Sequence, residues 1–400
     1  MKLSVIIVSY NVKYYLEQCV RSVIRSAEHM DYEILIIDNA SSDETVSYLM
    51  LRFPEWEYPQ VKIIANLRNI GFGRANNMAS KQAQGEFILF LNPDTILTEH
   101  TLEDCIKFAD EHSNVGGVGV RMLKSNGGFA LESRRGLPSP FTAFCKMSGL
   151  AAIFPKSRLF GRYYMRYLDD KEINKIDVVS GAFLMVKRSV LMQIGGFDKD
   201  FFMYGEDIDF SYRLLKMGLD NYYVPTPILH YKGESTEKSS YRYVHVFYEA
   251  MLIFFNKHYG HYSFYFSFLI RIAIYMRAIM ALIKQQGENL RAMINVRTDE
   301  PDVRYLFVGS TSMLDEVKSL CERWLLQADY INMNESGIHE RGHCGSSVDL
   351  SSYRYVVYDT EAFSYGDILS FFEKSQIENL SIGTYSIHTH VLLTADNIYT

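Results

Sequence analysis

Residues 86–95 read EFILFLNPDT and place an apolar run, Phe87–Leu91, directly before a polar cluster. Three earlier runs have the same form: Leu3–Val8 ends before SYN, Glu33–Ile37 before DNASSDET, and Val61–Ala65 before NLRNIGFGRANN. Longer amphipathic stretches separate these runs. Such alternation is typical of βαβ units with a parallel sheet, in which ligands bind beyond the carboxyl ends of the strands. The sequence therefore predicts an α/β fold in which four loops converge on one edge of a sheet.

Length and composition limit the class of protein. A chain of 400 residues allows two or three structural units. The net charge of −6 excludes nucleic acid as the main partner, because nucleic-acid-binding proteins need a basic surface. The five cysteines are odd in number and far apart, so they predict neither a disulfide framework nor a CxxC metal site. A reducing cytoplasm is the compartment that fits this pattern, and no feature specifies an oligomeric state.

The sequence divides into three regions. Residues 1–242 form the α/β domain, which is expected to end with a strand, a short helix, a Gly-Gly turn, a long helix and another strand. Residues 243–295 are predicted to be helical. Residues 302–400 form a small α/β unit, in which RYLFVGSTSMLDEVKSLCERWL predicts a strand, a Gly-Ser turn and an amphipathic helix, and YRYVVYDT with YGDILSFFEK repeats this order. This unit has no GxGxxG pattern, so nucleotide binding, packing and oligomerisation all stay open for it.

One segment, His261–Ile283, is long enough to cross a membrane. Arg271 lies at its middle and Arg277 follows, and each central Arg costs roughly 2.5–3.5 kcal/mol on insertion, which disfavours a spanning helix. With Lys257 and Lys284 on either side, an aromatic-rich helix in the bilayer surface is the preferred interpretation. The alternative is a helix buried within the protein or in a dimer.

Asp38 ends the second predicted strand. Ser41 and Glu44 have the spacing of a capping box for the helix that follows, so Asp38 is not needed for that cap. Its carboxylate can accept hydrogen bonds from the N–H groups of a pyrimidine base, with the SYN loop beside it. The alternative interpretation is an Asx-turn.

NIGFGRANN places Gly71 at a strand-to-helix turn, where backbone can approach a ligand and helix N–H groups can face an anion. Arg74 and Asn77 follow on the next turn. The segment is predicted to bind a nucleotide or phosphate, and a plain tight turn is the alternative.

YGEDIDFSYR opens a predicted helix in which Glu206, Asp209 and Arg213 share one face. Asp209 and Arg213 can pair at i,i+4. Asp207 lies roughly 100° away from that face and is predicted to be unpaired. The helix N-terminus stabilises an ionised carboxylate, as a general base requires. Acidic residues in a first turn are also ordinary helix design, which is the alternative.

ILHYKGEST ends the last strand of the first domain with His230, Lys232, Gly233 and Ser235. A histidine, a lysine and a Gly-Ser turn together can bind a diphosphate and complete a metal shell. A lone histidine at a strand end would be structural.

Taken together, SVIIVSYN, IIDNASSDET, NIGFGRANN, FLNPDT, VSGAFLMVKR, GGFDKDFFMYGEDIDFSYRL and HYKGEST resemble the family 2 glycosyltransferases of the GT-A fold, nearest to the bacterial branch often labelled rhamnosyltransferases. The resemblance covers roughly residues 1–250. It implies a Rossmann-like mixed sheet flanked by helices, followed by a helical extension and the small C-terminal α/β unit. It also implies an inverting transfer from a nucleoside-diphosphate sugar that uses Mg²⁺ or Mn²⁺.

The resemblance assigns roles to individual residues. It maps the base-contacting aspartate to Asp38, the metal aspartate to Asp94, and the catalytic base to Asp207 ahead of Glu206, while His230 assists the metal or the diphosphate. The predicted nucleotide-binding set is Ser9, Tyr10, Asn11, Asp38, Asn69, Gly71, Arg74, Asn77 and Asn92. Many such enzymes carry a first metal-site aspartate at the position of Asn92. The rhamnosyltransferase branch instead shares the Asn-Pro-Asp form found here. The donor's phosphate oxygens and waters can fill most of a cation's shell, so Asp94 with His230, or with a water held by Asn92, can suffice.

The favoured hypothesis is an enzyme that moves a sugar from a dTDP-rhamnose-like or UDP-sugar donor to a lipid-linked or polysaccharide acceptor. It would act in the cytoplasm, in peripheral contact with the inner membrane, in cell-surface glycan synthesis. One alternative is a sugar-phosphate nucleotidyltransferase, although the loop after the first strand lacks the Gly-rich form that a triphosphate needs. Another is a non-catalytic sugar-nucleotide sensor, suggested by the extra C-terminal unit.

Overall fold

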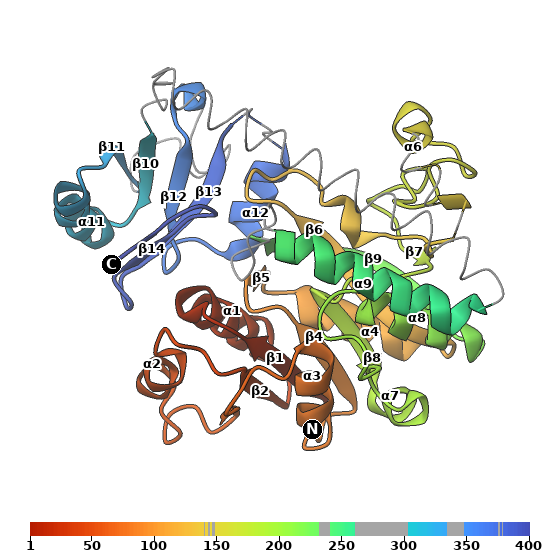
Figure 1. The fold of residues 1–400 in the computed structure, drawn as a ribbon. Helices are drawn as coiled ribbons and strands as arrows, with labels where there is room; N and C mark the ends of the chain where they lie inside the picture. Colours follow the sequence, from red (N-terminus) through yellow and green to blue (C-terminus); the bar gives the residue numbers. More distant parts are fainter. Residues whose placement is uncertain are drawn as a thin grey trace.

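The computed structural model describes residues 1–139, 141–142, 145, 149–231, 241–260, 303–333, 348–374, 377 and 379–400. Its larger sheet has nine strands in the order β3-β2-β1-β4-β8-β6-β9-β5, with β7 paired to β9 (Figure 1). The strands are β1 (Leu3–Ser9), β2 (Tyr32–Asp38), β3 (Val61–Ala65), β4 (Phe87–Leu91), β5 (Thr95–Leu97), β6 (Val115–Leu123), β7 (Asn174–Ile176), β8 (Phe183–Lys187) and β9 (Asp220–His230).

The four strands expected from the apolar runs lie side by side and parallel, as predicted. Every residue of β1 is buried, because helices cover both faces of a central parallel strand. Beyond β4 the sheet becomes mixed: β8 runs antiparallel to β4, and β6 antiparallel to β8. This mixed sheet flanked by helices confirms the fold class that the sequence predicts.

Alternate residues of β1 pack on opposite faces of the sheet. Leu3, Val5 and Ile7 contact the side that carries α1, α2 and α4, whereas Ile6 and Val8 belong to the cluster on the side of α3, α7 and α8. The helices are α1 (Lys13–Ser26), α2 (Thr45–Arg52), α3 (Phe72–Ser80), α4 (Thr101–Glu111), α7 (Arg188–Ile194) and α8 (Glu206–Lys216). The described residues between β6 and β7 include a 3-10 turn (Leu131–Ser133) and the short helix α6 (Leu150–Ile153).

The predicted order of elements after residue 176 is confirmed: β8, α7, the Gly195-Gly196 turn, α8 and β9 follow one another. The next helix, α9 (Tyr241–His258), packs on α8 through Ala250, Met251, Phe254 and Phe255. Helix α9 therefore packs as part of the first domain. The predicted surface helix, His261–Ile283, lies outside the described residues. No helix among the described residues has the length and apolar character needed to cross a membrane.

The C-terminal unit has its own six-stranded sheet in the order β11-β10-β12-β13-β14-β15. The first four strands of this order are parallel and the last two antiparallel. Its elements are β10 (Arg304–Gly309), α11 (Thr311–Trp324), β11 (Gln327–Asn332), a 3-10 turn (Leu350–Ser352), β12 (Tyr355–Asp359), α12 (Tyr365–Lys374), β13 (Ser381–Ser386), β14 (Val391–Leu393) and β15 (Ile398–Tyr399). The predicted strand, Gly-Ser turn and helix are confirmed as β10 and α11, with the Ser310 side chain capping the helix.

The C-terminal unit packs on the first domain along α1 and near β6 and β9 (Figure 1). Ile96, Leu229 and Tyr231 share one buried hydrophobic cluster with residues of the second sheet and of α12, among them Val308 and Phe372. Ion pairs cross the interface at Arg25–Glu361 and Arg121–Glu373, at 3.0 and 3.2 Å.

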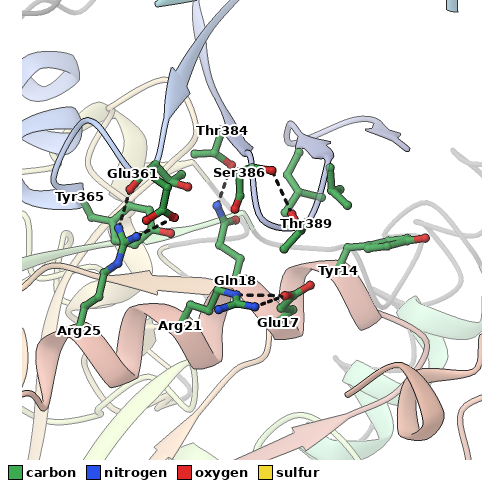
Figure 2. A pocket seen from close by; sticks show the side chains of 13 residues that line it. Tyr14, Glu17, Gln18, Arg21, Arg25, Glu361, Tyr365, Thr384, Ser386 and Thr389 are labelled. Atoms are coloured by element: carbon green, nitrogen blue, oxygen red, sulfur yellow. Dashed lines mark hydrogen bonds and ion pairs between the residues drawn. The ribbon is translucent and has the colours of Figure 1, made fainter. Parts of the chain in front are cut away.

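Figure 2 shows the polar side of this interface, where side chains of α1 face residues of β13 and of the loop after β12. The pocket between them has a volume of about 30 Å³. Such a space holds a few waters and is too small for a sugar.

Candidate active site

Ser9 and Asp38 end the neighbouring parallel strands β1 and β2 and lie opposite one another in register. Both are buried, and the Asp38 carboxylate accepts a hydrogen bond from the Ser41 amide at 2.9 Å and another from the Ser41 hydroxyl. Asn11 ties the two loops together, because its Oδ1 accepts from the Ser42 amide at 2.7 Å. The Tyr10 ring is 41% exposed beside them. The predicted base-binding residues are therefore neighbours at one sheet edge.

The capping box predicted for α2 is wrong. The helix begins at Thr45 after Glu44, whose backbone is left-handed and whose side chain makes no cap. The Ser41 hydroxyl bonds Asp38, and the Asp43 carboxylate accepts from the Thr45 amide at 3.2 Å. Ser41 therefore bonds Asp38 and does not cap α2. Asp38 forms the Asx-type turn that was the alternative interpretation of this residue.

Asn92, Asp94 and His230 come together at the ends of β4 and β9. The His230 imidazole Nε2 lies 3.4 Å from Asp94 Oδ1 and 3.5 Å from Asn92 Nδ2. Asp94 and His230 are 6% and 8% exposed. Strand pairing places them there, since β5 runs antiparallel to β9 with Thr95 opposite His230.

The turn at residues 180–182 joins this group to the acidic start of α8. On one side the backbone amide of Asn92 donates to the Ala182 carbonyl at 3.0 Å. On the other side the Gly181 amide donates to Asp207 Oδ2 at 3.1 Å. The proposed metal corner and the proposed base therefore lie on either side of one short turn.

The expectation that Asp207 is unpaired is wrong. Arg135, which follows the 3-10 turn after β6, donates to Asp207 Oδ2 and forms an ion pair with it. Asp209 pairs with Arg213 at 2.7 Å as expected, and its other oxygen lies 2.7 Å from His258 Nε2. The helical period shows that Asp207 lies on a different face of α8 from Asp209. It gives no information about partners from other parts of the chain, such as Arg135.

Glu206 differs from its neighbour. Burial and the negative charge of Asp207 raise the pKa of the Glu206 carboxyl to about 8. Its Oε2 atom is buried and has no hydrogen-bond partner among the described residues. At neutral pH the protonated form of the Glu206 carboxyl is therefore favoured.

Gly71, Arg74 and Asn77 are occupied by protein contacts. Gly71 has φ +85°, and a Cβ there would meet the Phe202 carbonyl oxygen at 2.5 Å, so the close approach is to backbone. The Arg74 guanidinium donates to the Lys199 carbonyl at 3.0 and 3.1 Å. Asn77 exchanges two hydrogen bonds with the Phe197 backbone. These three residues hold the segment before α8 in place.

Asn69 also has a local role, because its Oδ1 accepts from the Gly71 amide at 3.0 Å. Asn39 lies behind this turn; it is 3% exposed and bonds Asn66 at 2.9 Å. We therefore leave Asn69, Gly71, Arg74 and Asn77 out of the proposed ligand contacts and treat them as supports of the site.

The residues at the β4–β9 corner fit a hard divalent cation. Carboxylate oxygen suits both Mg²⁺ and Mn²⁺, whereas imidazole nitrogen suits transition ions, so Mn²⁺ fits this pair of ligands better than Mg²⁺. The His230 Nδ1 atom is buried without a hydrogen-bond partner among the described residues, so the ring is not locked by a second contact there. No group of three or more His, Cys, Asp or Glu residues that could hold a metal is found in the described part of the chain. Substrate oxygens or water would have to complete the shell.

Sequence reasoning missed Arg135 and the Gly181 amide. Arg135 belongs to an irregular stretch with neither a helical nor a strand period, so no local pattern singled it out. Gly181 lies in VSGAF, which the family resemblance marked but no chemical role explained. Only the tertiary structure shows that both donate to one carboxylate.

Residues 4–195 match the family model described as glycosyl transferase family 2. This part of the chain is therefore similar to the family 2 glycosyltransferases, and its mixed sheet with helices on both faces is the architecture that the sequence resemblance implies.

Characterised relatives agree on this class. The chain is 28% identical over 264 residues to an N-acetylglucosaminyl-diphospho-decaprenol L-rhamnosyltransferase of Mycobacterium tuberculosis, covering 63% of this chain and 83% of the relative. It is 26% identical over 242 residues to the rhamnosyltransferase WbbL of Escherichia coli, covering 55% and 80%.

Two solved structures are similar at lower identity. One is Staphylococcus aureus TarS 1–349, with 22% identity, 63% and 64% coverage and a TM-score of 0.40. The other is the mannosyltransferase PcManGT from Pyrobaculum calidifontis in complex with GDP-Man and Mn²⁺, with 16% identity, 73% and 80% coverage and a TM-score of 0.45.

Proposed function

We propose that this protein is an inverting glycosyltransferase that moves a sugar, with rhamnose the first candidate, from a nucleoside diphosphate to a lipid-linked or polysaccharide acceptor. The observation that carries the proposal is the 180–182 turn, which places the Asp94–His230 corner and Asp207 on its two sides. The relatives' names support sugar transfer, and the mycobacterial relative's name includes a diphosphate-linked lipid acceptor.

The donor would bind along the strand ends. Asp38 and Ser9 lie where a nucleobase can be held, and the exposed Tyr10 ring offers it a flat apolar surface. The diphosphate would then reach Asn92, Asp94 and His230. Mg²⁺ or Mn²⁺, when held by Asp94 and His230, would neutralise charge on the leaving diphosphate.

In the chemical step the acceptor hydroxyl oxygen attacks the anomeric carbon of the donor sugar. Asp207 takes the hydroxyl proton, and the bond from the anomeric carbon to the diphosphate oxygen breaks as the new glycosidic bond forms. Arg135 and the Gly181 amide orient the Asp207 carboxylate for this task. One displacement from the face opposite the leaving group inverts the anomeric centre.

A basic and apolar stretch between β6 and β7 supports a lipid-linked acceptor. Residues 149–168 contain four Lys or Arg residues and no Asp or Glu. Ile153, Phe154 and Leu159 in this stretch are 67%, 50% and 57% exposed. Basic and apolar side chains together fit the headgroups and outer acyl region of an anionic bilayer. We name the exposed residues 153–159 the apolar-basic patch and propose that it contacts the membrane that carries the acceptor.

The test of the function is a transfer assay with dTDP-rhamnose, UDP-sugars and GDP-mannose, each with and without Mn²⁺. One donor should be turned over, with product of inverted anomeric configuration by NMR. Asp207→Asn should lower kcat by about 100-fold or more, the scale of a lost general base. Full activity of Asp207→Asn would refute the base assignment.

Tight donor binding without turnover on any acceptor would instead support the sensor. Release of pyrophosphate from a nucleoside triphosphate would favour the nucleotidyltransferase, although the family match now opposes it.

A further inference from the structure

The C-terminal unit is connected by buried hydrogen bonds to the β4–β9 corner of the proposed active site. The connection begins at Thr384 on β13, whose hydroxyl accepts from Gln18 Nε2 at 2.7 Å (Figure 2). Gln18 Oε1 in turn accepts from the Tyr231 hydroxyl at 3.3 Å. Thr384, Gln18 and Tyr231 are 2%, 8% and 6% exposed. All three side chains are therefore buried in the interface, and Gln18 and Thr384 also line the small pocket of Figure 2.

Tyr231 brings this connection to the site itself. It follows His230 directly, and its backbone amide donates to the Asp94 carbonyl at 3.0 Å. Its ring packs edge-on against Tyr15 of α1, with centroids 5.2 Å apart. Tyr231 thus touches both members of the proposed metal corner through its backbone and is linked to the C-terminal unit through Gln18.

Helix α1 holds the same corner from a second direction. Cys19, next to Gln18, lies 3.5 Å from both the Asn92 carbonyl and the Thr95 hydroxyl. The Thr95 hydroxyl donates to the Asn92 carbonyl at 2.8 Å and so closes the turn that carries Asp94. Any shift of α1 at Gln18 is therefore passed to the turn as well as to Tyr231.

We propose that Thr384, Gln18 and Tyr231 are positioning residues through which the C-terminal unit sets the spacing of Asp94 and His230. The inference rests on the proposed function and gives the C-terminal unit a role in it. Partners that orient metal ligands from behind commonly change metal affinity 10–100-fold when they are removed. The unit would thereby tune binding of the divalent cation and the donor diphosphate without touching either.

The test is Thr384→Val in the full-length protein, which keeps the shape of the side chain and removes the hydroxyl. Affinity for Mn²⁺ is measured with UDP and dTDP in parallel, from the loss of the free-ion EPR signal, and transfer is measured against Mn²⁺ concentration. We expect Mn²⁺ affinity to fall about tenfold. The apparent KM for the metal should rise more than kcat falls. Thr384→Ser, which restores the hydroxyl, should return both values to within about twofold of wild type.

Two further variants separate positioning from general damage. Tyr231→Phe breaks the same connection from the other end, so it should match Thr384→Val, and the double variant should be no worse than either alone. Glu361→Gln is the matched control, because it removes the Arg25–Glu361 pair from the same interface without entering this connection. It should leave Mn²⁺ affinity unchanged.

The two proposals fail in different ways. A wild-type protein that neither binds Mn²⁺ with nucleotide nor transfers sugar refutes the proposed function. If the wild type does both, then unchanged Mn²⁺ affinity in folded Thr384→Val and Tyr231→Phe refutes the positioning role. An equal loss in Glu361→Gln would also refute it, because the effect would then belong to the interface as a whole.

Discussion

Glu206 and Asp207 are adjacent carboxyl groups whose surroundings favour different charges. Arg135 and the Gly181 amide stabilise the negative form of Asp207. Burial and that same negative charge raise the pKa of Glu206 to about 8. Environments that separate two carboxyl groups in this way also separate their chemical roles. Asp207 is thus suited to accept a proton at neutral pH, and Glu206 is suited to stay neutral.

The stability of the protein should depend on pH through Glu206. Its pKa rises from an ordinary 4.5 to about 8 on folding, so the folded state holds a proton that the unfolded chain releases over this range. The stabilisation is present in full below pH 4.5 and is lost as the pH rises toward 8.

Glu206→Gln mimics the neutral form at every pH. The difference between the Tm of Glu206→Gln and the Tm of the wild type should therefore increase between pH 5 and pH 9, by on the order of 5 °C. Thermal melts of both proteins across this range check the expectation, with Glu103→Gln on the exposed start of α4 as the control. A Tm difference that stays constant with pH would contradict it.

The same residues show how far sequence reasoning reaches into the site. Asn92, Asp94 and His230 were predicted as a group and do meet, because Asn92 and Asp94 lie in the turn after β4 and His230 ends β9. Arg135 was not predicted, because it arrives from an irregular loop and its partner is 72 positions away. Strand ends can be found from hydrophobic period, but partners supplied by loops depend on tertiary folding.

At the scale of elements, α12 begins with a cap from the other domain. The Glu99 carboxylate accepts from the Tyr365 and Gly366 amides at 2.9 and 3.0 Å. These amides are among the unpaired N–H groups of a helix start, where a negative charge is also favoured by the helix dipole.

Glu99→Ala should therefore lower the free energy of unfolding by about 1–2 kcal/mol, which is the usual loss for a helix cap. Chemical denaturation of the full-length protein measures this value. Glu103→Ala, an exposed acidic residue on α4, serves as the matched control and should change stability by less than about 0.5 kcal/mol. Equal effects of the two substitutions would show that the cap contributes nothing.

Element prediction succeeded where strands are continuously apolar. Val61–Ala65 and Phe87–Leu91 have the predicted bounds. Strand β6 was missed because three glycines interrupt its apolar run. A Cβ on Gly119 would meet the Val179 side chain at 2.8 Å, so close packing explains that glycine. The antiparallel neighbours of β4 could not be predicted either, because a local pattern does not state which strands pair.

At the scale of the whole molecule, charge is distributed unevenly. The chain has a net charge of −6, whereas the four charged residues of 149–168 are all basic. Figure 1 shows α6, at the start of the apolar-basic patch, at the end of the molecule away from α2. The patch is therefore the stretch that we expect to face an anionic bilayer.

Substituting Ile153, Phe154 and Leu159 together with serine should reduce binding to phosphatidylglycerol vesicles by at least about tenfold, because the apolar contact is lost. Lys156→Glu should weaken binding further and remove part of its salt dependence. Flotation of the full-length protein with anionic and with phosphatidylcholine vesicles measures both effects.

The control for these variants is Leu51→Ser on α2, an 82% exposed apolar side chain outside the patch. It should bind vesicles like the wild type. Transfer to a short water-soluble acceptor should persist in all of these proteins, so a loss of membrane binding can be told from a loss of catalysis. Unchanged flotation of the triple variant would exclude the patch as the contact surface.

The hydrophobic cluster shared by Ile96, Leu229 and Tyr231 with the C-terminal unit restricts how the two units of this protein can move relative to one another. Many two-domain enzymes open and close by a hinge, because the surface between their domains is small and polar. Here, rotation of the C-terminal unit would separate buried side chains on the strands that carry the proposed metal corner. If the proposed function holds, we expect donor entry and product release to depend on rearrangements within the first domain, with the C-terminal unit staying packed against it.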